Sequence, residues 1–306
     1  MDTGSDTVQR HYVGNWKDAE YSVPAIYDGH CEGYSRASLV DHTIAPTAVH
    51  MGVALVTIEP GGSVNPHLHA YEKGFYVLEG SVIVSVDGNR YQLGKDDYGL
   101  IPLGATHAWR NISSESALIL EMIAPQPKPP ENDFKDTFFH PNGSAPTEAD
   151  ATDLPDFKDP REAKYLGHFD EGQLPPAGNV QAAGARSSSI HGVSIVEFID
   201  RMLGAQHMSM FVVQFQPGGV GNIHDHMFEE TYFFLSGEAE ANLDGNVYRI
   251  KAGEYVWNGV NCMHGFKTIG DEPVRWIETQ APLPTPTEAF RFKAQWEALR
   301  NKIEGG

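Results

Sequence analysis

The sequence contains an internal repeat, and this repeat constrains the fold more than any other feature. Residues 51–130 align with residues 208–287 at one constant offset and without a gap. The alignment superimposes Pro-Gly-Gly, His-x-His, Asp-Gly-Asn and Ala-Pro motifs, and it places His107 on His264. Self-similarity over such a length predicts two copies of one structural unit.

The pattern within each copy is typical of an all-β protein. The chain has 306 residues, enough for two domains of ordinary size, and it is rich in glycine and proline. Its β-branched and aromatic residues cluster in short runs that are separated by turn signals. In each copy an Asp-Gly pair, at Asp87-Gly88 and at Asp244-Gly245, lies between two such runs and predicts a β-hairpin.

The second copy carries a group of candidate metal ligands. His224, His226 and Glu230 are all even-numbered, so on one continuous extended strand their side chains point to the same face. His264, from a distant strand, supplies a third imidazole. Three imidazoles and one carboxylate suit a divalent ion, and we expect one ion of Mn or Fe, with Zn, Ni and Co as alternatives.

The spacing of these residues resembles the first motif of the cupin family. That motif is reproduced by Gly218, His224, His226, Glu230 and Gly237. The second motif is looser: Gly253 and His264 fit it, but glycine and asparagine stand where proline and glycine are usual, at Gly259 and Asn261. The resemblance implies a bicupin, with two double-stranded β-helix (cupin jelly-roll) barrels, the metal inside the second, and a short C-terminal helix.

The chain divides into five parts on this interpretation. The helix is predicted by two features: a segment typical of a helix N-cap, Thr285-Pro286-Thr287-Glu288, and an apolar stripe at Phe292, Trp296, Leu299 and Ile303. We expect this helix to pack on a barrel or at a subunit interface. The proline-rich connector should wrap a barrel in part. The predicted parts are an N-terminal arm (1–45), cupin barrel 1 (46–130), the connector (131–190), cupin barrel 2 (191–284) and the helix (285–306).

The first copy has a second, weaker set of candidate ligands. His67, His69 and His107 are retained, but Lys73 takes the position of the ligand carboxylate, and Glu72 is out of phase with the histidines. An ammonium group beside a divalent cation is repelled. Three interpretations stay open. The barrel holds a three-histidine metal site, with the Lys73 side chain swung away from the ion or deprotonated; it is empty, with Lys73 hydrogen-bonded inside; or Lys73 itself takes part in a reaction.

Four protein ligands on an ion that prefers six leave two open positions for a substrate or for oxygen. Glu230, Tyr232 and Trp257 are the candidate catalytic residues, because Tyr232 shares the inward phase of Glu230 and Trp257 precedes His264. With Phe234 the two aromatic residues should line the metal pocket. The candidate outer contacts are Asn258, Asn261, Cys262 and Glu278, of which Glu278 is expected rather to mark a strand end.

Among two-barrel cupins the resemblance points to gentisate-type dioxygenases, oxalate decarboxylases and ureidoglycine aminohydrolases. We expect an Fe- or Mn-dependent oxidoreductase, a dioxygenase, that acts on a small organic acid or aromatic able to chelate the metal. One alternative is a non-redox hydrolase, lyase or isomerase such as a ureidoglycine aminohydrolase-like enzyme. The other is a non-catalytic storage or ligand-sensing bicupin.

The net charge of −19 disfavours nucleic acid and anionic membranes as partners. The chain has two cysteines, far apart, and neither a signal-peptide pattern nor a long apolar run. These features predict a cytoplasmic protein with a small-molecule substrate. The resemblance adds the expectation of a homo-oligomer.

Overall fold

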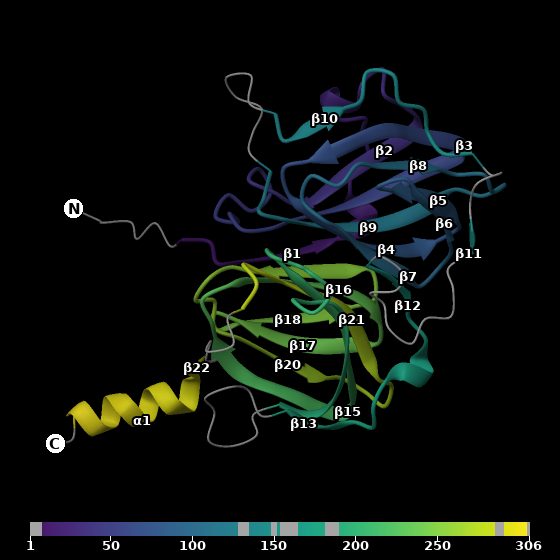
Figure 1. Cartoon of the computed structure of the whole chain (residues 1–306). Helices are drawn as coiled ribbons and strands as arrows, with labels where there is room; N and C mark the ends of the chain where they lie inside the picture. Colours follow the sequence, from purple (N-terminus) through teal and green to yellow (C-terminus); the bar gives the residue numbers. More distant parts are fainter. Residues whose placement is uncertain are drawn as a thin grey trace, which may run out of the picture.

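The computed structural model describes residues 8–127, 135–147, 152–153, 165–180, 190–284 and 291–304. It contains two 11-stranded sheets, each curled on itself, and one α-helix among these residues. In Figure 1 the first barrel lies above the second, and the ends of the described chain extend to one side. The prediction of an all-β fold with two barrels is confirmed.

The first barrel takes its strand order from antiparallel pairings around β3. The order is β11-β6-β5-β8-β3-β9-β4-β7-β12, and β2 and β10 also pair with β3. Its principal strands are β2 (Cys31–Val40), β3 (Gly52–His69), β4 (Glu72–Glu79), β5 (Val82–Val86), β6 (Asn89–Leu93), β7 (Asp97–Ile101), β8 (His107–Arg110) and β9 (Ala117–Ala124).

The second barrel repeats this topology. Its order runs β1-β19-β16-β21-β15-β20-β17-β18, and β14 pairs with β15 as β2 pairs with β3. His224 lies opposite His264 in this barrel and His67 lies opposite His107 in the first, so the sequence repeat is a structural repeat. The strands are β14 (Ile190–Ile199), β15 (Ser209–Asp225), β16 (Glu229–Ser236), β17 (Glu238–Leu243), β18 (Asn246–Lys251), β19 (Glu254–Asn258), β20 (His264–Thr268) and β21 (Val274–Ala281).

The N-terminal arm is shorter than predicted. Strand β1 (His11–Asn15) crosses to the second barrel and pairs with β19. Short 3-10 turns follow at η1 (Trp16–Asp18) and η2 (Ala25–Tyr27). Strand β2 then pairs along its length with β3, so residues 31–40 belong to the first barrel and the predicted boundary at residue 46 is wrong. Alternation is weak in this strand because small and polar residues separate its buried positions.

Parts of the connector add to both barrels, as predicted. Strand β10 pairs with the end of β3, β11 with β6, β12 with β7 and β13 with β14. These pairings fix the connector to the sheets it passes. The elements are β10 (Thr137–Phe139), β11 (Thr152–Asp153), β12 (Leu166–His168), η5 (Glu171–Gln173) and β13 (Gly178–Val180).

The C-terminal segment begins with a strand before its helix. Strand β22 (Arg291–Phe292) pairs with His224 and Asp225, and α1 (Lys293–Glu304) follows and projects from the second barrel (Figure 1). Phe292 is therefore not a helical residue, and Ile303 is 81% exposed rather than packed. The predicted cap at residues 285–288 lies outside the described residues. No helix in the described ranges has the length and apolar character needed to cross a membrane.

Two buried carboxylates connect the barrels across a shared hydrophobic core. Glu229 accepts hydrogen bonds from the backbone N–H groups of Val49, His50 and Met51, just before the first barrel's long strand. Glu72 accepts equivalent bonds from Gln206 and His207, just before the second barrel's long strand. Glu72 therefore faces the neighbouring barrel and not the histidines, as its phase predicted.

Candidate metal centres

Three histidines of the second barrel converge in its interior. His224 lies near the end of β15, His226 follows in the turn before β16, and His264 begins β20. All three are buried, and one nitrogen from each lies within 4.8 Å of those of the other two. The antiparallel pairing of β15 with β20 brings His264 to this place from a distant part of the chain.

The backbone orients each of these imidazole rings. The Nδ1 atoms of His224, His226 and His264 lie 2.7, 2.8 and 2.9 Å from the carbonyl oxygens of Asn222, Phe228 and Cys262. A carbonyl only accepts, so each Nδ1 carries the proton and each Nε2 presents a lone pair. Burial, followed by the neighbouring His264, lowers the pKa of His224 to about 3, which keeps this ring neutral.

Glu230 joins the three imidazoles. Its Oε2 atom lies 2.8 Å from His226 Nε2 and 3.1 Å from His264 Nε2. An ionised carboxylate beside three imidazole lone pairs is a donor set that fits a divalent transition-metal ion.

Two further side chains hold the Glu230 carboxylate. The Tyr232 hydroxyl donates to Oε2, and Gln280 Nε2 donates to Oε1 at 2.9 Å. Burial, then the charges of Glu230 and Glu278, raises the pKa of Tyr232 well above its usual value, so Tyr232 is a neutral donor. No pattern in the sequence indicates that Gln280 contacts Glu230, although the two residues are directly opposite in the pairing of β16 with β21.

Glu278 does not mark a strand end. It lies within β21, where its carboxylate accepts from Trp276 Nε1 at 2.9 Å and from Gln280 Nε2 at 3.3 Å. Burial, followed by the charge of Glu230, raises the pKa of Glu278 well above its usual value. Glu278 thus supports the contacts of Glu230 indirectly, through Gln280.

Trp257 is not part of the pocket, which corrects the prediction. In the pairing of β16 with β19, Asn258 lies opposite Glu230, and Trp257 lies opposite Thr231. Adjacent residues of a strand face opposite sides, so Asn258 shares the face of Glu230 while Trp257 faces away. Its indole N–H donates to Glu229 at 3.3 Å in the inter-barrel core. The aromatic residues that pack inside the barrel include Tyr232, Phe234, Phe266 and Trp276.

The remaining candidate contacts have mostly structural roles. Asn261 has a left-handed backbone, with φ of 65°, which is typical of asparagine in a turn. Cys262 is buried and contributes its carbonyl oxygen to orient His264. Asn258 is fully buried on the face of Glu230, so it is the one that can contact a ligand there.

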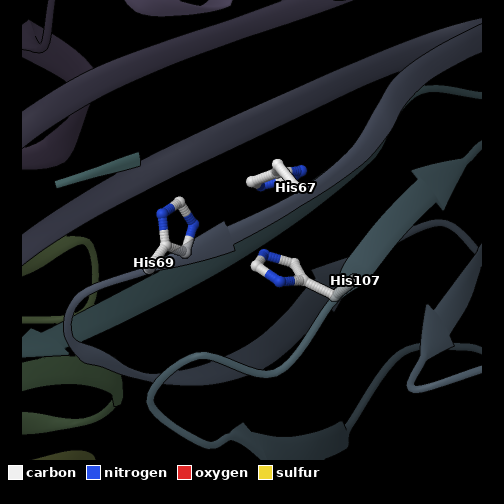
Figure 2. A group of neighbouring side chains, drawn as sticks. All are labelled: His67, His69 and His107. Atoms are coloured by element: carbon white, nitrogen blue, oxygen red, sulfur yellow. The ribbon is translucent and has the colours of Figure 1, made fainter. Parts of the chain in front are cut away.

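The first barrel holds an equivalent trio of histidines (Figure 2). One nitrogen from each of His67, His69 and His107 lies within 4.8 Å of the others. Their Nδ1 atoms are 2.8, 2.9 and 3.1 Å from oxygens of Asn65, Thr137 and Ala105. The three Nε2 atoms are buried, and within the described part of the chain they have no hydrogen-bond partner. The trio fits a metal ion, because burial without a partner is costly for such atoms.

Lys73 lies near this trio and is hydrogen-bonded to a carboxylate. Its Nζ donates to Glu121 Oε1 at 2.8 Å, and both side chains are buried. Arg36 Nε lies 3.6 Å from the other oxygen of Glu121. Burial, followed by the charge of Lys73, lowers the pKa of His67 to about 3. Lys73 is therefore hydrogen-bonded inside the barrel while the three neutral imidazoles face one another.

Comparison with known proteins agrees with this architecture. A 34% identical match over 99 residues covers 32% of this chain and 63% of the polyketide synthase protein CurC of Streptomyces cyaneus. The tetracenomycin polyketide synthase protein TcmJ of Streptomyces glaucescens is 30% identical over 129 residues, 42% of this chain and 85% of that protein. Quercetin 2,3-dioxygenase of Bacillus subtilis is 24% identical over 283 residues, 81% of each chain.

Solved structures also resemble this chain in fold. Oxalate decarboxylase of Lactobacillus farciminis superimposes with a TM-score of 0.62 at 16% identity, over 95% of this chain and 90% of that one. The family model described as "Cupin domain" matches twice, at residues 54–123 and 211–279, within the two barrels. The chain therefore belongs to the cupin family and is a two-barrel member of it.

Proposed function

We propose that this protein is a metal-dependent oxidoreductase, a dioxygenase, with its active site in the second barrel. The observation that carries the proposal is the convergence of Glu230 with three imidazoles beside a buried cluster of aromatic side chains. The similarity to quercetin 2,3-dioxygenase over 81% of both chains supports the oxidative class. The substrate class that fits is a small organic acid or aromatic with two adjacent oxygen donors.

The residues present would hold the ion through His224, His226, His264 and Glu230. A bound Mn or Fe ion would offer its remaining coordination positions either to a chelating substrate or to a substrate together with oxygen. Tyr232 and Gln280 fix the orientation of the carboxylate, which keeps the ligand geometry constant. Asn258 lies on the same face and can donate its amide to an oxygen atom of the substrate. The surrounding aromatic residues exclude water and contact an aromatic ring.

Oxygen dependence tests the reaction class. Protein reconstituted separately with Mn and Fe should consume oxygen in step with a catechol, flavonol or 2-hydroxy acid substrate. We expect turnover to stop under anaerobic conditions and in His264→Ala, measured with an oxygen electrode and by chromatography of products. Lys267→Ala, which removes an exposed ion-pair partner, is the matched control and should keep its activity. Undiminished turnover without oxygen would show a non-redox hydrolase, lyase or isomerase instead.

A further inference from the structure

A third group of potential metal ligands lies apart from the two histidine trios. It consists of His11 on β1, Asp244 in the turn between β17 and β18, and Cys262 in the loop between β19 and β20. Each residue offers one ligand atom, and these three atoms lie within 4.8 Å of one another. Strand β1 reaches this place by pairing with β19. The group therefore joins the N-terminal strand to two connections of the second barrel.

The aspartate of this group has a structural role that the first barrel repeats. Asp244 Oδ1 accepts from a backbone N–H of the loop before β20 at 3.0 Å. In the first barrel, Asp87 Oδ1 accepts in the same way from the N–H of Thr106, also at 3.0 Å. The position that corresponds to Cys262 in the repeat is Ala105. The shared turn thus accounts for the aspartate, but it gives no reason for a thiol and an imidazole beside it in the second barrel.

The His11 side chain is in the state that a metal ligand needs. Its Nε2 atom lies 3.0 Å from the Tyr248 hydroxyl, and a proton donated there from Nε2 leaves a lone pair on Nδ1. Nδ1 is buried, lies 3.8 Å from Asp244 Oδ2, and has no hydrogen-bond partner among the described residues. Burial lowers the pKa of His11 against the opposing charge of Asp244, so the ring is neutral. A bound cation would satisfy this nitrogen, which is otherwise costly to bury.

The three side chains together match the ligand preferences of Zn²⁺ and similar ions. Imidazole nitrogen, carboxylate oxygen and thiolate sulfur are the three kinds of protein ligand that Zn²⁺ takes. A thiolate selects such ions against Mg²⁺, Ca²⁺ and Mn²⁺, which prefer oxygen. The incoming ion displaces the thiol proton of Cys262 to the solvent. The thiolate and the Asp244 carboxylate then balance the two positive charges of the ion.

The surroundings give an ion access to this group. Arg10 Nε donates to Asp244 Oδ2 at 3.0 Å, but the Arg10 side chain is 47% exposed. Each carboxylate oxygen has two acceptor positions, so this hydrogen bond leaves Asp244 able to bind an ion. His11 and Asp244 line an open groove of about 600 Å³. An ion can enter through this groove, and water can complete its coordination.

We propose that His11, Asp244 and Cys262 form a further metal site, which binds Zn²⁺ or a similar thiophilic ion and fastens strand β1 to the second barrel. The carbonyl oxygen of Cys262 orients His264, so the bound ion would also hold the loop that positions this histidine. The proposal concerns a separate set of ligands and does not depend on the reaction proposed above.

The sulfur ligand gives this site a spectroscopic signature. The full chain is freed of metal and titrated with Co²⁺, and the near-ultraviolet charge-transfer band from thiolate to cobalt is recorded. The histidine trios and Glu230 offer no sulfur, so this band reports the proposed site alone. We expect the band in the wild-type protein and in Cys31→Ser, the matched control, and its loss in Cys262→Ser. Glu230→Ala should keep the band, because the centre inside the barrel is separate.

Two further variants test the other ligands. His11→Gln and Asp244→Asn should each weaken Co²⁺ binding at this site by more than about tenfold, because losing even an outer partner of a ligand costs 10- to 100-fold. The exposed His42→Gln and Asp87→Asn, in the equivalent turn of the first barrel, are the matched controls and should bind Co²⁺ like the wild type.

Anomalous scattering from wild-type crystals soaked in Zn²⁺ locates the ion even if a variant fails to fold. We expect a peak that lies between the imidazole, the carboxylate and the thiolate of the proposed site. A wild-type protein without the charge-transfer band, a band that Cys262→Ser or His11→Gln leaves intact, or a map without a peak at these residues would overturn the proposal.

Discussion

Replacing Glu230 by alanine should remove the metal ion from the second barrel. The carboxylate contacts two of the three histidines and is the negative charge nearest to the ion position. Its loss leaves three neutral imidazoles around a divalent ion. We expect the metal affinity of this barrel to fall by more than about 100-fold, because losing an outer partner alone typically costs 10- to 100-fold. Metal content after dialysis against a weak chelator measures the effect, and activity should be lost in parallel.

Graded variants separate ligation from general damage to the fold. Tyr232→Phe and Gln280→Leu each remove one hydrogen bond to the carboxylate and should weaken metal binding by about 10-fold or more. Glu240→Ala removes an exposed ion-pair partner on the same sheet and should leave metal content unchanged. Retention of the full metal content in Glu230→Ala would mean that this carboxylate is not a ligand.

Replacing Glu229 by alanine should destabilise the protein strongly without affecting the metal directly. Glu229 is buried and accepts from three backbone N–H groups and from the Trp257 indole. Alanine leaves these donors buried without an acceptor. We expect a loss of about 3–5 kcal/mol in the free energy of unfolding, since breaking a buried charged network has a cost of this size. Urea denaturation of metal-free protein, followed by tryptophan fluorescence, measures it.

The replacement Glu229→Gln keeps one acceptor and the side-chain volume, so it should cost less than Glu229→Ala. Glu72→Ala tests the equivalent contact in the other barrel, where two backbone N–H groups lose their acceptor. The exposed Glu32→Ala is the control and should change stability by less than about 0.5 kcal/mol. If Glu229→Ala unfolds like this control, the inter-barrel carboxylates do not contribute to stability.

The sequence predicted two copies of one unit from the internal repeat, whereas the barrel fold and the place of His264 were implied by the resemblance to the cupin family. The repeat predicts two copies whatever the loops do. The expected continuous strand is interrupted, however: β15 ends at Asp225, and Glu230 reaches His224 and His226 from the next strand, β16, after a turn.

Which residues of β19 face the inside of the barrel is set by the pairing of β19 with β16, and these two strands are separated in the sequence by β17 and β18. That pairing turns Asn258 inward and Trp257 outward, and no local pattern at residues 257–258 indicates it.

Long-range partners were also beyond the reach of the sequence. Lys73 and Glu121 lie on neighbouring strands and meet only after the barrel closes, so the direction of the lysine could not be derived from spacing. Strand β2 was assigned to the arm because its apolar and polar residues do not alternate regularly. Strands β10 and β22 each add to a histidine-bearing strand, and two or three residues are too few to show periodicity.

The most direct test of the account is an anomalous difference map at the Mn or Fe edge, from crystals of protein purified without added metal. The account predicts a peak in the second barrel at the point where Nε2 of His224, His226 and His264 and a carboxylate oxygen of Glu230 meet. A map without this peak after soaking in Mn²⁺ or Fe²⁺, or with the ion bound to other residues, would contradict it.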